Sequence, residues 1–324
     1  MVHITDLSTV PPEQAAASRP VYGTIGQPII EPGTVLSAAL LEDMRRLGIR
    51  HAVITDEETR DVRFDELIES KLWMRYVLIM RKVYLNATSG DFAEFELFDA
   101  AMSIVEQART RSMIVPLPTS SVPCALQPFA HVVNVAIWAA QIGVHIDLHA
   151  SSLVDLTVGC LLHDIGKLLT EQQSEHAEAG YRFVKRQFPP SSDIPHIVLQ
   201  HQNVPMAGLR RFTLDKPFVE LTRICQMCNY LDHLSCEGEA MHYGALEVLM
   251  ALHNTMFTGD ELQALVQVAP KYMPGSTIKV HDGRTAVVVK LTERADRPML
   301  RFSGTSTIVM PDGLSSMPAS LVKP

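Results

Sequence analysis

The sequence predicts a mainly helical protein with a small mixed α/β module at its N-terminus and a small β module at its C-terminus. Leu, Ala and Met are abundant, and aromatic residues make up only 6% of the 324-residue chain. Within 129–268 apolar residues recur at helical spacing, and short segments rich in Pro, Gly or Ser separate the runs. After Gly275 the period changes to two, which is typical of strands.

The N-terminal module is expected to cover 1–62. Residues 1–20 show no regular pattern, and we expect them to be poorly ordered. A short helix follows, with Ser37 as its N-cap and Gly48 just past its end. The β-branched run at 51–55 reads as a strand.

Three further segments complete the predicted organisation. A helical connector is expected at 63–115, broken at the sequence NATSGD, and a loop rich in Pro and Ser follows it. The helical domain itself is expected at 116–270. The β module at 271–324 contains the runs TIKV, TAVVVKLT, PMLRFS and TIVM, and Asp282-Gly283 between the first two predicts a hairpin.

Composition excludes several classes of protein. A net charge of −8 argues against a partner that is a nucleic-acid polymer, which needs a basic surface. The N-terminus lacks the pattern of a signal peptide, and the most apolar run, 129–148, is too polar to span a membrane. Five cysteines in this length do not form a disulfide framework, so we expect a cytoplasmic protein. Cys225 and Cys228 share a helix face, which favours core packing over a zinc or redox role.

The stretch CLLHDIGKLL places His163 and Asp164 next to each other in an apolar segment. Each side chain is costly to bury without a partner, so the pair is either an internal ion pair or part of a metal site. His131, His176 and His201 lie at starts, ends or faces of neighbouring predicted helices, where imidazoles can turn toward a shared centre. Four such histidines favour the metal site over the ion pair.

The residue types fit a divalent transition metal such as iron, manganese or zinc, because these ions accept imidazole nitrogen and carboxylate oxygen together. Asp164 has two carboxylate oxygens and can therefore bridge two ions, which a histidine cannot do. Bridged ions lower the pKa of a shared water and hold a phosphate oxygen. Lys167, one turn further, is then placed to stabilise negative charge on a phosphoryl group. Asp164 and Lys167 are the expected catalytic residues, with one or two ions.

The order H…HD…H…H resembles the HD superfamily of metal-dependent phosphohydrolases, and HDIGK, EHAEAG and the LQH helix end resemble its HD-GYP branch. The resemblance covers 121–232 and implies an HD-type helical bundle that hydrolyses cyclic di-GMP. It assigns metal binding to His131, His163, Asp164, His176 and His201, with Asn229 at the position of the last ligand. Such domains often pair through helices, which makes a homodimer an expectation.

The chain departs from the HD-GYP pattern at several positions. One of two adjacent family histidines is replaced, at Gln202 or, in another register, at Gln200. The family aspartate is Asn229, an additional glutamate of some members is Gln127, and NVPMAGLRR lacks the Gly-Tyr-Pro signature. The segment between Lys167 and His176 is also short. Asp232 and His233, one turn past Asn229, are expected to be exposed rather than substitute ligands.

These observations leave three interpretations. The first is a metal-dependent phosphohydrolase that acts on a cyclic dinucleotide or a related phosphodiester with weakened or altered activity. The second is a catalytically degenerate signalling module that binds a nucleotide or a partner. The third, an ion pair without a metal, ranks last because it leaves His131, His176 and His201 unexplained.

Overall fold

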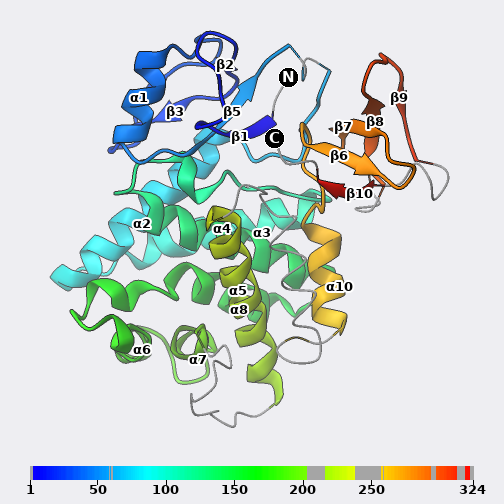
Figure 1. Cartoon of the computed structure of the whole chain (residues 1–324). Helices are drawn as coiled ribbons and strands as arrows, with labels where there is room; N and C mark the ends of the chain where they lie inside the picture. Colours follow the sequence, from blue (N-terminus) through cyan, green and yellow to red (C-terminus); the bar gives the residue numbers. More distant parts are fainter. Residues whose placement is uncertain are drawn as a thin grey trace.

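The computed structural model describes residues 3–57, 59, 61–202, 216–237, 257, 259–292, 297–311 and 318–321, of which 216–220, 236–237, 259 and 318–321 are described by their backbone alone. Helices form the body of the molecule, and the two small β modules lie at one end of it (Figure 1). The mainly helical fold with its mixed N-terminal and β C-terminal modules is therefore confirmed.

The N-terminal module contains a helix and short strands: β1 (His3–Asp6), β2 (Ala16–Ala17), β3 (Val21–Tyr22), β4 (Pro28–Ile30), α1 (Ala38–Arg46) and β5 (His51–Thr55). The predicted cap and strand are confirmed, since the Ser37 hydroxyl accepts a hydrogen bond from the Leu40 N–H. Poor order in 1–20 was a wrong expectation for residues 3–20. β1 and β2 both pair antiparallel with β5, a partner distant in sequence that no local pattern reveals.

The helical body is built around α4, whose residues from Phe129 to Gly143 are all buried. Its helices are α2 (Ser70–Ser89), α3 (Glu94–Thr110), α4 (Gln127–His145), α5 (Ala150–Leu162), α6 (His176–Gln187), α7 (Ile194–Gln200), α8 (Lys216–Glu237) and α10 (Gly259–Val268). Among the described residues, short 3-10 turns lie between these helices: η1 (Thr119–Ser121), η2 (Ile165–Leu168) and η3 (Gln173–Glu175). One hydrophobic core extends from α2 to α10, so α4 is packed on several sides.

Polar residues of α4 hold the preceding loop against the core. The Gln141 side chain accepts from the Ile114 N–H at 2.6 Å and donates to the Ile114 carbonyl oxygen at 2.9 Å. Asn134 donates to the carbonyl oxygen of Leu117 at 2.9 Å. These bonds satisfy buried backbone groups in a segment whose only strand-like pairing among the described residues is the isolated bridge between Val115 and Leu67. None of the helices that the structure describes combines the length and apolar character that a membrane crossing requires.

The C-terminal module is a five-stranded antiparallel sheet in the order β10-β6-β7-β8-β9. Its strands are β6 (Thr277–Val280), β7 (Thr285–Lys290), β8 (Met299–Phe302), β9 (Ile308–Val309) and β10 (Pro318–Leu321). The Asp282-Gly283 hairpin is confirmed, with Gly283 in the left-handed region at φ +90°. The strand β10 was not predicted, because the sequence PASL carries no β-branched residue and forms a strand only by pairing with β6.

Candidate metal centre

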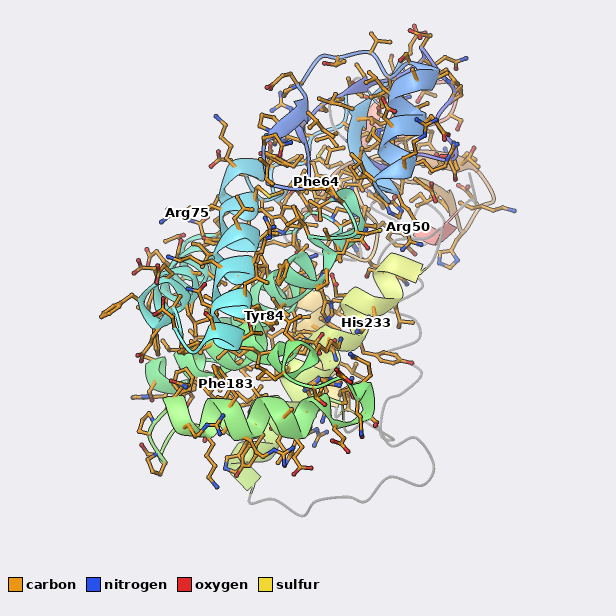
Figure 2. The ribbon with its side chains drawn as sticks, turned by 90° about the vertical axis from the view of Figure 1, so that its left-hand side faces the viewer. Arg50, Phe64, Arg75, Tyr84, Phe183 and His233 are labelled. Carbon is orange, nitrogen blue, oxygen red and sulfur yellow. The ribbon has the colours of Figure 1, made fainter. Side chains whose placement is uncertain are left out.

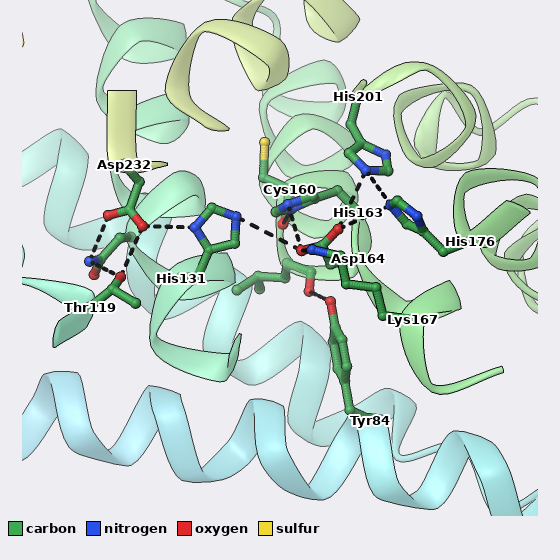
Figure 3. A network of polar contacts seen from close by, with 12 residues as sticks. Tyr84, Thr119, His131, Cys160, His163, Asp164, Lys167, His176, His201 and Asp232 are labelled. Carbon is green, nitrogen blue, oxygen red and sulfur yellow. Dashed lines mark hydrogen bonds and ion pairs between the residues drawn. The ribbon is translucent and has the colours of Figure 1, made fainter. Parts of the chain in front are cut away.

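Five of the predicted ligands converge in the helical body (Figure 3). His131 lies in the second turn of α4, and His163 and Asp164 follow the last residue of α5. His176 is the first residue of α6, and His201 directly follows α7. All five are buried, with exposed fractions between 0% and 6%.

The glycine of HDIGK is required by the packing of the turn η2 on α6. A Cβ atom added at Gly166 would lie 1.8 Å from the carbonyl oxygen of His176 and 2.7 Å from the amide nitrogen of Gly180. Both obstacles are backbone atoms, so only a residue without a side chain permits this approach. The two glycines thereby bring His176 to the carboxylate of Asp164, which precedes η2.

The first half of the centre is formed by His131, His163 and one oxygen of Asp164. The Nε2 atoms of the two histidines lie 3.9 Å and 3.6 Å from Asp164 Oδ2. Both Nε2 atoms are buried, and neither has a hydrogen-bond partner among the described residues. Buried polar atoms of this kind are uncommon in proteins and are typical of sites that hold an ion or a water.

The second half is formed by His176, His201 and the other oxygen of Asp164. Each Nε2 atom lies 3.4 Å from Asp164 Oδ1, and the two Nε2 atoms lie 3.1 Å from each other. One carboxylate therefore faces two pairs of imidazoles, with one oxygen directed to each pair.

The opposite ring nitrogens are all held by oxygen acceptors. Nδ1 of His163, His176 and His201 donates to the carbonyl oxygens of Cys160, Gln173 and Val198 at 2.7, 2.5 and 2.7 Å. Nδ1 of His131 lies 2.7 Å from Asp232 Oδ2. Because a carbonyl oxygen only accepts, these contacts place the proton on Nδ1 and leave the Nε2 lone pairs facing Asp164. This is the tautomer that binds a metal, so the residues present fit a cation at the centre.

The electrostatics of the centre favour an ionised carboxylate. Burial alone would raise the pKa of Asp164, but its contacts with His163, His176 and His201 hold it well below its usual value. Burial lowers the pKa of His163 well below its usual value, which keeps that imidazole neutral. Burial opposes protonation of His131, but its hydrogen bond to Asp232 raises its pKa, and the contact with Asp164 raises the pKa of His176. Metal coordination requires an ionised carboxylate and neutral imidazoles, so a bound ion displaces any proton that these two rings hold.

Lys167 lies on η2 with its ammonium nitrogen 2.5 Å from Asp164 Oδ2. Its side chain is 36% exposed, in contrast to the buried ligands. Lys167 thus stands between Asp164 and solvent. A positive charge at this position faces any anionic group that approaches the carboxylate from outside.

Asp232 holds a larger hydrogen-bond network around His131 (Figure 3). Its Oδ2 accepts from the Thr119 hydroxyl at 2.9 Å, and its Oδ1 accepts from the Asn134 amide at 3.0 Å. Asn134 in turn accepts from the Trp73 indole N–H at 2.8 Å. Burial opposes ionisation of Asp232, but the hydrogen bonds from His131, Asn134 and Thr119 keep its pKa below its usual value.

The expectation that Asp232 would be exposed was wrong, since its exposed fraction is 4%. Its position in α8 could have revealed this, because Asp232 lies four residues after Cys228 and seven after Cys225, on one buried helix face. His233 is exposed as expected, with its ring 4.5 Å from that of His131 between centroids. Cys225 and Cys228 are buried and free, in agreement with core packing.

The residues that depart from the family pattern have different environments. Asn229 is buried, and its Oδ1 has no hydrogen-bond partner among the described residues. Gln127 donates to two backbone carbonyl oxygens at 3.0 and 3.1 Å. Gln200 is buried and Gln202 is exposed. The segment NVPMAGLRR, where the Gly-Tyr-Pro signature is missing, lies outside the described residues.

Residues 129–233 match the model of the HD domain. This segment is an HD domain. It includes all six residues predicted as metal ligands and spans α4 to α8. HD domains form a metal-dependent phosphohydrolase family, and the paired His/Asp groups of this one can hold a metal.

No curated protein matches the chain. Among solved structures, the chain is similar to an HDG"Y"P protein from Bdellovibrio bacteriovorus, at 16% sequence identity and a TM-score of 0.45. The similarity covers 82% of this chain and 98% of the other.

Proposed function

We propose that the chain is a metal-dependent phosphohydrolase of the HD-GYP type that acts on a cyclic dinucleotide, cyclic di-GMP, or a related phosphodiester, with weakened or altered activity. The observation that carries this proposal is the carboxylate of Asp164, with one oxygen directed to His131 and His163 and the other to His176 and His201. Such an arrangement suits two neighbouring ions, and phosphodiester hydrolysis is a typical reaction of paired ions.

In this proposal His131, His163, Asp164, His176 and His201 hold iron, manganese or zinc, and Asn229 contributes a neutral amide oxygen. A bound ion of this kind supplies Lewis acidity and lowers the pKa of water. The chain orients the ligands through the oxygen atoms that hold each Nδ1 atom. Lys167 contributes the positive charge that faces the phosphoryl group.

Weakened activity is proposed because the site lacks one anionic ligand. Asn229 brings no charge where the family pattern has an aspartate, so the ligand set has one negative charge fewer to balance a dication. The same observation favours the second candidate function, a signalling module that binds a cyclic dinucleotide without cleaving it. Both candidates require the metal centre.

A hydrolysis assay tests the proposal. The purified chain is loaded with iron, manganese or zinc and given cyclic di-GMP and bis(p-nitrophenyl) phosphate, with Asp164→Ala as the reference. We expect slow hydrolysis that depends on both the metal and Asp164. If neither compound is cleaved while cyclic di-GMP binds the metal-loaded chain in calorimetry, the binding module replaces the hydrolase. Equal activity in Asp164→Ala would contradict both candidates.

A further inference from the structure

A cavity lies outside the HD domain, between the strands β3 and β4 and the outer side of α2. Its volume is about 820 Å³, which is in the range of small-molecule sites. None of the predicted metal ligands lines it. Figure 2 shows the two sides of α2, with Arg75 projecting outward and Tyr84 directed into the helical body.

The floor of this cavity is apolar. Met74 is buried, and Leu78 and Ile79, one turn further along α2, are half-buried. The turn between β3 and β4 closes directly onto the helix, since a Cβ atom at Gly26 would lie 2.6 Å from Leu78 Cδ1. Gly26 also has φ +80°, a conformation that other residues rarely adopt. The walls are therefore fixed by close packing of the turn on the helix.

Two hydroxyl groups in the lining lack partners. Tyr22 and Ser70 have exposed fractions of 6% and 3%, and neither Tyr22 Oη nor Ser70 Oγ has a hydrogen-bond partner among the described residues. Both residues line the cavity, one from β3 and the other from the first turn of α2. Buried hydroxyls normally form hydrogen bonds, so two unsatisfied ones on residues of one lining favour a polar ligand group that a small rotation of either side chain would reach.

The charged residues of the lining leave an excess of positive charge. Arg19, Lys71 and Arg75 line the cavity and form no ion pair with a described residue, and Arg19 Nε is also buried without a hydrogen-bond partner. The fourth cation, Lys82, is paired with Glu96. Two carboxylates, Glu31 and Glu69, complete the charged lining. Three unpaired cations against two carboxylates leave one net positive charge, which one monoanion neutralises.

We propose that this cavity binds a small organic monoanion with an apolar ring or chain, of the carboxylate class. The apolar body packs on Met74, Leu78 and Ile79. The anionic group lies among the cations of the lining, where a small rotation of Tyr22 or Ser70 lets its hydroxyl donate to the anion. A second negative charge on the ligand is disfavoured, because Glu31 and Glu69 already offset two of the cations.

The ligand chemistry is tested on the full chain with the fluorescent monoanion 8-anilino-1-naphthalenesulfonate. Three competitors of equal chain length displace it in parallel titrations: decanoate, the neutral alcohol decanol and the dianion decanedioate. We expect decanoate to compete about tenfold better than decanol, the ratio expected for one hydrogen bond to a charged group. Decanedioate should also displace the fluorescent probe less effectively than decanoate does. Equal competition by decanol and decanoate would overturn the anionic specificity.

Substitutions on α2 test the location. Ile79→Trp fills the cavity and Arg75→Glu reverses one cation, whereas Arg81→Glu makes the same charge change at a residue of α2 outside the lining. We expect the first two variants to weaken decanoate competition at least fivefold and Arg81→Glu to leave it unchanged, with equal circular dichroism spectra. Arg75 is exposed, so Arg75→Glu carries the test if Ile79→Trp fails to fold. Equal competition by decanoate in Arg75→Glu and Arg81→Glu would overturn the proposed site.

Discussion

The Nε2 atoms of His176 and His201 face each other at 3.1 Å, and each lies 3.4 Å from Asp164 Oδ1. The Nδ1 atoms of both rings donate to backbone carbonyl oxygens. Two neutral imidazoles in these positions direct two lone pairs and a carboxylate oxygen at one point. Only a positive charge there, a metal ion or an added proton, makes the arrangement favourable.

The two halves of the metal centre should be separable by substitution. Asp164→Ala removes both carboxylate oxygens and should abolish metal binding, whereas His176→Ala should reduce the metal content while His131 and His163 retain part of it. Elemental analysis of purified, metal-loaded variants gives the stoichiometry. His145→Gln, at an exposed position of α4, is the control and should bind as much metal as wild type. Full metal content in Asp164→Ala would disprove the assignment of this centre.

The packing of Gly166 against α6 predicts the effect of the smallest side chain. Gly166→Ala places a methyl group 1.8 Å from the His176 carbonyl oxygen, so η2 and α6 must separate. We expect a loss of about 1–3 kcal/mol in the free energy of unfolding and a lower metal content. Gly33→Ala is the control, because its methyl group meets no atom within 4 Å and adds only the strain of φ +88°. Denaturant titration compares the two, and equal stability of both variants would show that η2 adapts.

The bond between Asp232 and His131 predicts a change in metal affinity. Asp232→Asn can keep an oxygen acceptor for His131 and Thr119, but it removes the negative charge, and its NH2 group then faces the amide of Asn134, which is also a donor. We expect metal affinity to fall about 10–100-fold, as for other partners of metal-bound histidines. Competition with a chelator measures the affinity. An unchanged affinity would mean that Asp232 only packs in the core.

Restoring the family carboxylate should strengthen the centre. Asn229→Asp converts a buried amide whose Oδ1 has no partner among the described residues into an anion, and a cation nearby offsets the cost of burying it. We expect more metal per chain and faster hydrolysis of bis(p-nitrophenyl) phosphate. Gln263→Glu makes the same charge change at an exposed position of α10 and should alter neither quantity. A metal content and a rate that both remain at the wild-type level would show that Asn229 lies outside the functional ligand set.

The buried His51 predicts sensitivity to acid outside the metal centre. Its Nδ1 lies 2.6 Å from the Ser120 hydroxyl, and burial lowers its pKa below the usual 6.5. The unfolded chain therefore binds more protons as the pH falls below 6.5, so the free energy of unfolding decreases there. In His51→Gln this decrease between pH 7.5 and 5 should be smaller, as measured by urea titration. The same decrease in wild type and variant would show that His51 is not responsible, and His145→Gln again provides the control.

The sequence predicted those features that depend on local pattern. Helices such as α4 and α5 follow from apolar spacing, and the cap at Ser37 and the turn at Gly283 follow from the properties of single residues. Features that depend on distant partners were missed. The strand β1 forms only because β5 lies beside it, and the burial of Asp232 becomes evident only when α8 packs against α4.

In the candidate site, too, the sequence predicted the features that depend on local pattern and missed those that depend on distant partners. The candidate ligands on and next to α4 to α7 could be named from residue types and from the HDIGK motif. The carbonyl oxygens that fix each Nδ1 atom could not, because any residue provides a carbonyl and only the folded backbone aligns it. The domain boundaries, the substrate and the roles of Lys167 and Asn229 remain predictions.

The sharing of Asp164 by ligands from separate helices has a mechanical consequence. His131 and His201 belong to segments that are far apart in the chain, and His176 is 25 residues from His201. Metal bound in both halves of the centre would connect α4, α6 and α7 through Asp164, as a disulfide connects distant parts of a secreted domain. The unfolded chain does not bring these ligands together, so an ion that binds only the folded chain would increase the free energy of unfolding. A metal bound at this centre would therefore stabilise the helical body in addition to any role in hydrolysis.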